Sequence, residues 1–363
     1  MHLDGSEAPQ ASPDPRRRPR LTPPIADARR AVRSALVAAA ALAPLDPHDD
    51  HGPARPEPLA PGAVVLVGLS GGADSLALAA ATAFEAPRNG FRAGAVIVDH
   101  ALQPGSDAVA AGAAEQATAL GLDPVLVERV EVDSPGGPEA AARAARHAAF
   151  DRALAETGAQ RILLGHTLDD QAETVLLGLA RGSGPSSLQG MLPDTGRLLR
   201  PFLGLRRSQT RAFCDDSGLK VWDDPHNDDP SYTRVRVRGS VLPVLERELG
   251  PGVAEALART AEQLREDDEA LDGLALEWAQ ELVSQTEEGA VALDVRGLAA
   301  DPAALRQRII RLVVSAEFGV SLTRTQTLAV AALITDWHGQ GAVDLPGVRV
   351  VRQNGLLTFQ PTT

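Results

Sequence analysis

This 363-residue chain has very little cysteine, very little lysine and no long apolar runs. Cys214 is the one cysteine, which excludes an intramolecular disulfide and a cysteine-based zinc cluster. Lys220 is the one lysine, and it lies far from any glycine-rich stretch. A Walker A lysine, a Schiff-base lysine or a kinase strand lysine would have to be this residue, so we expect none of those sites.

No stretch of about 18 uninterrupted apolar residues occurs, so we expect no membrane span. The N-terminus is rich in proline, arginine and polar residues, and Pro23-Pro24 interrupts it where a signal peptide would be apolar. We therefore expect a disordered tail at residues 1–24 and a cytoplasmic protein. The formal net charge of −13 argues against a generally basic nucleic-acid coat but leaves room for a local basic face.

Strand and helix patterns alternate after residue 62. Short apolar runs rich in β-branched residues predict strands at 63–68, 93–98, 124–132 and 161–165. Helical patterns follow these strands at 74–85, 107–120, 138–157 and 168–181. Strands separated by helices predict βαβ units, so the fold class is α/β with a parallel sheet covered on both faces.

The C-terminal third has a different pattern. Helices are predicted at 241–265, 271–284, 301–318 and 323–336, and short strands follow with turns at 346–347 and 354–355. After the tail we expect a helix and linker at 25–61, a parallel-sheet domain at 62–240 and a smaller, mainly helical domain at 241–363. A metal site in the linker is a weaker interpretation than a solvated spacer. That site would consist of His48, Asp49, Asp50 and His51.

Residues 70–75, which we call the glycine loop, read Ser-Gly-Gly-Ala-Asp-Ser and stand between the first strand and the next helix. Glycines let a backbone approach an oxyanion closely, and free N–H groups at a helix N-terminus favour negative charge. At the carboxyl end of a parallel strand, this composition predicts a phosphate site. The alternative is an ordinary helix cap by Ser70 or Asp74. The loop is not a Walker A motif because no lysine ends it, so γ-phosphoryl transfer is disfavoured.

A second polar group follows the fourth predicted strand. It comprises His166, Asp169, Asp170 and Glu173. Asp74 and Asp170 follow strands of one sheet edge and could face one Mg²⁺ ion together with ATP phosphates. Stabilisation by the helix dipole is the alternative explanation of the acidic residues. Arg143 and Arg146 are three residues apart on a helix, so one can point at the site while the other is solvated; a surface role for both is the alternative.

The glycine loop resembles that of the PP-loop ATP pyrophosphatases, whose motif is SGGxDS. Further motifs follow it in order: VDH at 98–100, EAAARAARHAAF at 139–150, GHTLDDQAETVL at 165–176, LLRPFLGLRR at 198–207 and WDDPHNDDPSYTRVRVRGSVLPVL at 222–245. Together they resemble the tRNA(Ile)-lysidine synthetase family over about half of the chain, and the last two motifs discriminate it from other PP-loop families.

The resemblance implies an ATP-dependent ligase that adenylates the C2 oxygen of the wobble cytidine in CAU-anticodon tRNA(Ile) and releases pyrophosphate. Free L-lysine then displaces AMP, and the codon specificity changes from AUG to AUA. The implied catalytic residues are Asp74, Arg143 and Asp170, and the implied Mg²⁺ ligands are Asp74 and Asp170. The implied ATP-binding residues are Ser70, Gly71, Gly72, Ala73, Asp74, Ser75, Asp99 and His100. The domain at 62–240 would then be catalytic, and the domain at 241–363 would recognise tRNA.

Arginines concentrate between residues 197 and 238, where they could contact tRNA phosphates and stack on loop bases. The expected tRNA-binding residues are Arg200, Arg206, Arg234, Arg236 and Arg238. A merely solvated charged face is the alternative, since several aspartates lie nearby in the sequence. Two positions depart from the family pattern: Gly165-His166 replaces a His-His pair, and Val235 replaces an asparagine.

Two other functions are considered. A tRNA 2-thiolation enzyme of the same superfamily needs cysteines, usually as CxxC, and a single Cys214 speaks against it. A nucleotide-binding regulator without turnover would release no AMP when tRNA, lysine and Mg²⁺ are supplied. The sequence allows a homodimer without specifying one.

Overall fold

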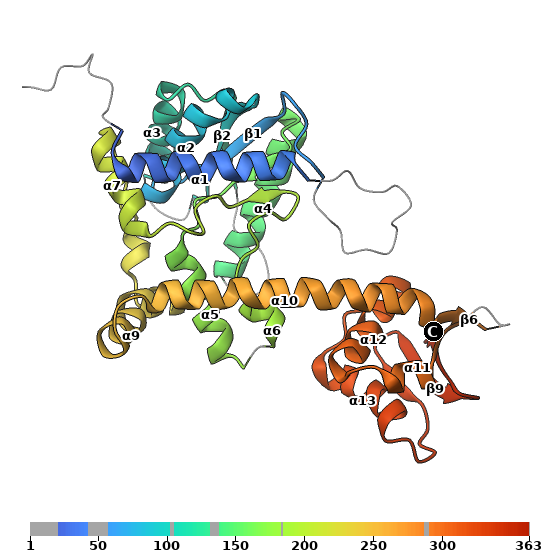
Figure 1. The fold of residues 1–363 in the computed structure, drawn as a ribbon. Helices are drawn as coiled ribbons and strands as arrows, with labels where there is room; N and C mark the ends of the chain where they lie inside the picture. Colours follow the sequence, from blue (N-terminus) through green and yellow to red (C-terminus); the bar gives the residue numbers. More distant parts are fainter. Residues whose placement is uncertain are drawn as a thin grey trace, which may run out of the picture. The chain divides into compact units, whose positions relative to one another are not determined.

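The computed structural model describes residues 21–42, 57–101, 105–130, 138–182, 184–286 and 290–362. Most of the expected tail and the linker residues His48–His51 lie outside these ranges. The chain forms two compact units (Figure 1). Of the described residues, the first unit contains those in 21–42, 57–173 and 192–254, and the second contains those in 174–191 and 255–362.

The first unit is built on a parallel sheet, which confirms the predicted α/β class. Its strands, in spatial order, are β3 (Val125–Arg129), β2 (Arg92–Asp99), β1 (Val64–Gly68), β4 (Arg161–Leu163) and β5 (Leu198–Leu199). Strand β5 was not predicted, because two residues are too short to show a pattern.

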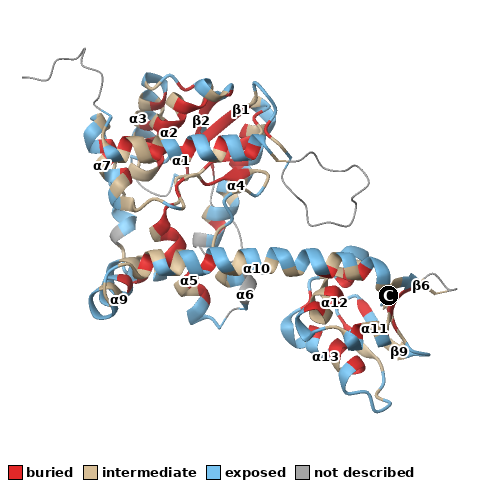
Figure 2. Ribbon diagram, in the orientation of Figure 1, coloured by how far each residue is buried: buried red, intermediate tan, exposed pale blue. Residues whose placement is uncertain are grey.

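Helices cover both faces of this sheet. The side chains of β1 alternate between two apolar cores: Val65 and Val67 join the core that contains α1 and α2, and Leu66 joins the core that contains Phe150 of α4. Figure 2 shows the buried residues along β1 and β2. A strand buried on both faces is typical of parallel sheets and explains its continuous apolar run.

The helices of the first unit are α1 (Pro23–Ala40), α2 (Ala73–Glu85), α3 (Ser106–Ala119), α4 (Pro138–Thr157), the start of α5 (Leu168–Ala180), α7 (Arg207–Ser217), α8 (Thr233–Arg236) and α9 (Leu242–Leu249). The first five agree with the predicted positions to within a few residues, whereas α7 and α8 were not predicted. Short helical turns are η1 (Pro87–Asn89), η2 (Pro225–Asp228) and the π-helical η3 (Val237–Val241). Helix α1 begins inside the expected tail, since Pro23 is well placed for a first helical turn. It packs on α2 and α7 through Ile25, Val32 and Leu36.

The second unit combines helices with an antiparallel sheet. The helices are α6 (Pro185–Leu188), α10 (Val253–Leu282, which begins in the first unit), α11 (Val295–Ala300), α12 (Ala303–Phe318) and α13 (Arg324–Thr335). The strands, in spatial order, are β6 (Val283–Gln285), β7 (Val291–Asp294), β10 (Leu356–Pro361), β9 (Val348–Gln353) and β8 (Val343–Leu345). Ile309, Ile310 and Val313 of α12 pack with Leu293 and Phe359 of the sheet in one core.

Two helix predictions for this region are wrong. Residues 241–265 do not form one helix, and residues 271–284 do not form a separate one, because α10 runs for 30 residues from Val253 to Leu282. The break lies earlier, at the Gly-Pro-Gly of 250–252, where Gly250 has a φ of +97° and ends α9. The acidic run 266–269 contains no helix breaker, so the helix continues through it. None of the described helices combines the length and the apolarity that crossing a membrane requires.

Candidate functional site

The glycine loop forms a tight turn between β1 and α2. Gly71 has a φ of +84°, a left-handed conformation that glycine adopts without strain, and Gly72 caps α2 in an extended conformation. The hydroxyl of Ser75 accepts a hydrogen bond from the Ser70 backbone N–H at 3.1 Å and lies 3.0 Å from the Gly72 carbonyl, to which it donates. The loop is therefore fixed by its own side chains and exposes the N-terminus of α2.

A cavity of about 1140 Å³ opens at the carboxyl ends of β1, β2 and β4. Seven of the eight residues expected to bind ATP line it: Ser70, Gly72, Ala73, Asp74, Ser75, Asp99 and His100. The loop from Trp222 to Asn227 also lines this cavity, and the Trp222 N–H donates to the Gly71 carbonyl at 3.0 Å. The structure thus brings the glycine loop, the end of β2 and a distant loop to one opening.

Gly165, which follows β4, allows the second polar group to lie close to the glycine loop. A Cβ at this position would lie 2.9 Å from the backbone carbonyl carbon and oxygen of Asp74 and 3.1 Å from the Ser75 nitrogen. Only glycine fits so close to another backbone without displacing it. The absence of a side chain here therefore lets the two loops meet.

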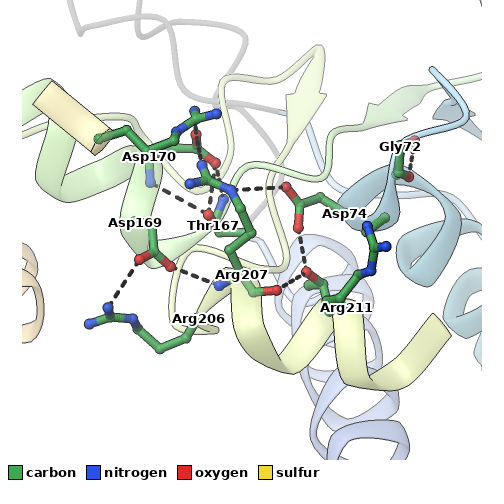
Figure 3. A network of polar contacts seen from close by, with 12 residues as sticks. Gly72, Asp74, Thr167, Asp169, Asp170, Arg206, Arg207 and Arg211 are labelled. Atoms are coloured by element: carbon green, nitrogen blue, oxygen red, sulfur yellow. Dashed lines mark hydrogen bonds and ion pairs between the residues drawn. The ribbon is translucent and has the colours of Figure 1, made fainter. Parts of the chain in front are cut away.

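Arg207 at the start of α7 joins carboxylates from both loops (Figure 3). Its Nη2 donates to Asp170 at 2.7 Å and lies 3.5 Å from Glu173, and its Nε lies 3.5 Å from Asp74. Its backbone N–H donates to Asp169 at 2.7 Å. Arg207 ends the LLRPFLGLRR motif and belongs to the arginine-rich region, but the sequence did not predict its contacts with these carboxylates.

The two carboxylates expected to bind Mg²⁺ have opposite pKa shifts. Burial raises the pKa of Asp74 above its usual range, more than hydrogen bonding from Thr210 and the charge of Arg207 lower it. Burial also raises the pKa of Asp170, but the charge of Arg207 and the hydrogen bonds from Thr167, both 2.8 Å long, outweigh it and leave the pKa lowered. Asp170 is therefore a firmly ionised carboxylate on the cavity wall, whereas Asp74 binds a proton more readily.

Asp74 and Asp170 form a donor set that suits Mg²⁺. Among the described residues, no group of three or more acidic, histidine or cysteine side chains is arranged to hold a metal ion. Mg²⁺ is usually held by only one or two carboxylates together with substrate phosphates. These two carboxylates line the same cavity as the glycine loop, so they fit that pattern.

Glu173 is the centre of a second set of arginine contacts. Its side chain is fully buried, and Arg238 donates to it from Nε at 2.8 Å, while Arg234 lies 3.5 Å from it. Arg238 stands in the π-helical turn η3, and such turns often occur at functional sites. A smaller cavity of about 130 Å³ adjoins this cluster. Its lining consists of Asp169, Glu173, Arg206, Arg207, Arg238, Leu242, Pro243, Glu246 and Ala254.

The helix rotation decides which arginine of α4 faces the cavity. Arg146 lines it, whereas Arg143, the residue expected to be catalytic, does not, although both residues are exposed. Arg143 is still close enough for its charge to lower the pKa of His147 and of Arg200. The structure therefore places Arg146 nearer to the predicted phosphate site than Arg143.

The five arginines expected to bind tRNA have different surroundings. Arg236 is exposed and donates to the carbonyls of Pro230 and Ser231. Arg206 lies 3.1 Å from Asp169, and Arg234 and Arg238 contact Glu173 as described above. Arg200 is 8% exposed. Its guanidinium contacts the ring of His166. All of these arginines except Arg236 thus contact His166, Asp169 or Glu173, and the sequence alone does not show these contacts.

Comparison with known proteins identifies two family models in this chain. The model of the PP-loop domain matches residues 55–245, and the model of the TilS substrate binding domain matches residues 293–358. The first match covers the glycine loop, the acidic group and η3. The second lies within the second unit.

Curated relatives match over most of the chain. A protein of Leifsonia xyli named tRNA(Ile)-lysidine synthase is 81% identical over 332 residues, which are 92% of this chain and 100% of that relative. A protein of the same name from Thermobifida fusca is 52% identical over 295 residues, 81% of this chain and 90% of that relative. Among solved structures, the U34-tRNA thiolase NcsA from Methanococcus maripaludis with its 4Fe-4S cluster matches with a TM-score of 0.51 and 19% identity, over 67% of this chain and 80% of that one. At this identity the likeness shows a shared fold alone.

Proposed function

The chain belongs to the tRNA(Ile)-lysidine synthase family, and from that premise we propose which of its residues carry the reaction. It is an ATP-using ligase that forms lysidine on tRNA(Ile), as the sequence motifs predicted. The residue roles, the metal, the amine donor and the assembly state below are proposals.

The glycine loop is the proposed site of the ATP phosphates. Its support is the cavity that places the N-terminus of α2, Ser70 and Ser75 around one opening at the carboxyl edge of the sheet. His100 lines the same cavity, and its Nδ1 is buried without a hydrogen-bond partner among the described residues. A buried polar atom of this kind is explained when a ligand supplies the missing partner.

Asp74 and Asp170 are the proposed Mg²⁺ ligands. When bound, the ion would offset phosphate charge during cleavage between the α- and β-phosphates. Arg207 contacts both carboxylates and would keep them close together. Arg146 and Arg143 would stabilise negative charge at the phosphates, with Arg146 the nearer of the two to the cavity.

Free L-lysine is the proposed amine donor. A carboxylate that stays ionised can hold an ammonium group in place by its charge. The lowered pKa of Asp170 and the buried Glu173 beside it support this role for the acidic group.

The tRNA contacts are proposed for both units. Arg236 is the exposed arginine of the predicted set, and Arg206, Arg234 and Arg238 surround the acidic group where the wobble cytidine would enter. The match to the TilS substrate binding domain supports a further tRNA contact by residues 293–358. We propose a cytoplasmic enzyme without membrane association, and a homodimer stays a prediction that sedimentation can check.

Mass analysis of the wobble nucleoside tests this function. Incubation of the full chain with CAU-anticodon tRNA(Ile), ATP, Mg²⁺ and lysine should convert the wobble cytidine to lysidine and release AMP. Leaving out lysine or Mg²⁺, or replacing the tRNA with tRNA(Met), should leave the cytidine unmodified. An unmodified cytidine in the complete reaction would contradict the function.

A further inference from the structure

Arg200 is buried and forms its hydrogen bonds within the first unit, although the sequence predicts it to contact tRNA. It follows β5 directly and is 8% exposed. Its Nη1 donates to the Leu192 carbonyl at 2.6 Å, and its backbone N–H donates to the Pro193 carbonyl at 2.8 Å. Two hydrogen bonds to the backbone thus hold both ends of this residue.

Among the described residues, the Arg200 guanidinium also contacts the ring of His166. Its Nε donates to His166 Nδ1 at 3.3 Å. A guanidinium carries only donors and stays protonated, so Nδ1 must accept and carries no hydrogen. The proton of the neutral imidazole then lies on Nε2. The hydrogen bond therefore selects one of the two tautomers of His166.

The surroundings of His166 also keep its ring neutral. Burial lowers its pKa to about 4, and the charges of Arg200, Arg234 and Arg146 lower it as well, while Asp170 raises it. The ring is thus uncharged at neutral pH. An uncharged ring with a hydrogen on Nε2 can donate one hydrogen bond without adding charge.

We propose that Arg200 is a positioning residue for His166, which it holds in the Nε2-protonated tautomer as a neutral hydrogen-bond donor to the nucleotide phosphates. The proposal rests on the nucleotide site proposed above. His166 lines the cavity of the glycine loop and stands beside Gly165, where the two loops meet. In this arrangement His166 does not act as a general base, because its acceptor nitrogen is occupied by Arg200.

The tautomer can be observed without any activity measurement. The full chain is labelled with ¹⁵N-histidine, and the signals of His166 are identified among the eight histidines by their loss in His166→Gln. At pH 7 we expect the chemical shifts of a ring protonated on Nε2 alone. A hydrogen on Nδ1, or on both nitrogens, would overturn the proposal.

A kinetic cycle tests whether the contact matters for the reaction. Arg200→Met removes the donor, Arg200→Lys keeps a donor and the charge, and His166→Gln removes the ring. We expect Arg200→Met to lower kcat/KM for ATP by about ten- to a hundredfold, the effect of losing a charge-assisted hydrogen bond. Arg200→Lys should recover part of the loss. Arg200→Met combined with His166→Gln should be no slower than His166→Gln alone, because the two residues act through one contact.

Arg236→Met is the matched control, since Arg236 is exposed and contacts backbone carbonyls. It should leave the His166 spectrum unchanged. The proposal fails if Arg200→Met raises the KM for tRNA and leaves kcat unchanged, which is the result expected of a tRNA phosphate contact. It also fails if the losses of the two single variants multiply in the double variant. If Arg200→Met does not fold, the spectra of the unsubstituted protein and of Arg200→Lys decide the question. Absence of lysidine formation by the unsubstituted chain would overturn the proposed function and leave the spectroscopic result valid.

Discussion

Replacing Gly165 with alanine should displace the backbone of the glycine loop at Asp74 and Ser75. The new Cβ would lie 2.9 Å from the backbone of Asp74, whereas ordinary van der Waals contact starts at 3.4 Å. The neighbouring atoms belong to the backbone of the first turn of α2, so the two loops must separate by about 0.5 Å. Overpacking of this kind costs about 1–3 kcal/mol in the free energy of unfolding.

The effect on catalysis should exceed the effect on folding. Because catalytic groups must be held closely in place, a displacement of about 0.5 Å at Asp74 should lower kcat/KM for ATP by roughly tenfold or more. The melting temperature should fall by roughly 2–10 °C. The assays are tRNA-dependent AMP release at varied ATP concentrations and thermal unfolding followed by circular dichroism.

Gly112→Ala is the matched control for this substitution. Gly112 lies within α3, and a Cβ there would meet no atom within 4 Å. Alanine in a helix should stabilise the protein by about 0.5–1 kcal/mol and leave ATP kinetics unchanged. If Gly165→Ala matched the unsubstituted protein in melting temperature and in ATP kinetics, the close contact between the two loops would be refuted.

Three further substitutions test separate features of the site. Asp170→Asn should lower AMP formation by about a hundredfold or more, since a firmly ionised carboxylate is lost. The pKa of Asp170 is lowered in the folded protein, so its ionised form adds stability above the ordinary aspartate pKa, and this stability is lost as pH falls through the folded pKa. In urea unfolding, Asp170→Asn should therefore lower the free energy of unfolding more at pH 7 than at pH 3. An equal loss at both pH values would contradict the lowered pKa. Cys214 is buried, and its Sγ lies 3.3 Å from the Ala73 carbonyl. Burial raises the pKa of its thiol to about 12, so a thiol reagent at pH 8 should label Cys214 only after unfolding in urea. Cys214→Ala should keep lysidine formation within about twofold at a cost of about 1 kcal/mol in stability, and loss of the reaction in a folded variant would instead indicate a chemical role for sulfur. Lys220→Arg should leave the KM for ATP within about twofold, because this exposed residue keeps its charge and its backbone contacts to Gln116; a large increase would mean that the one lysine reaches the nucleotide.

The local features of the first unit could be predicted from the sequence. A buried strand, a turn that needs glycine and a helix N-terminus all arise from neighbouring residues, so residues 64–85 reveal them directly. The order of the motifs identified the family, since each motif is short and contiguous. Elements that depend on distant partners were missed: β5 exists because it pairs with β4, and β6 and β7 exist because of the antiparallel sheet.

Only the tertiary structure decided the direction of the charged side chains. The sequence places Arg200, Arg206, Arg234 and Arg238 in one basic region, but the folded chain turns them toward His166, Asp169 and Glu173. Arg207 likewise meets carboxylates from two distant loops. The physical reason is that a guanidinium that loses part of its water contacts must find other acceptors, and those acceptors come from segments far away in the chain. The sequence by itself determined which chemical groups the site contains, and the packing of the loops determined which of them meet.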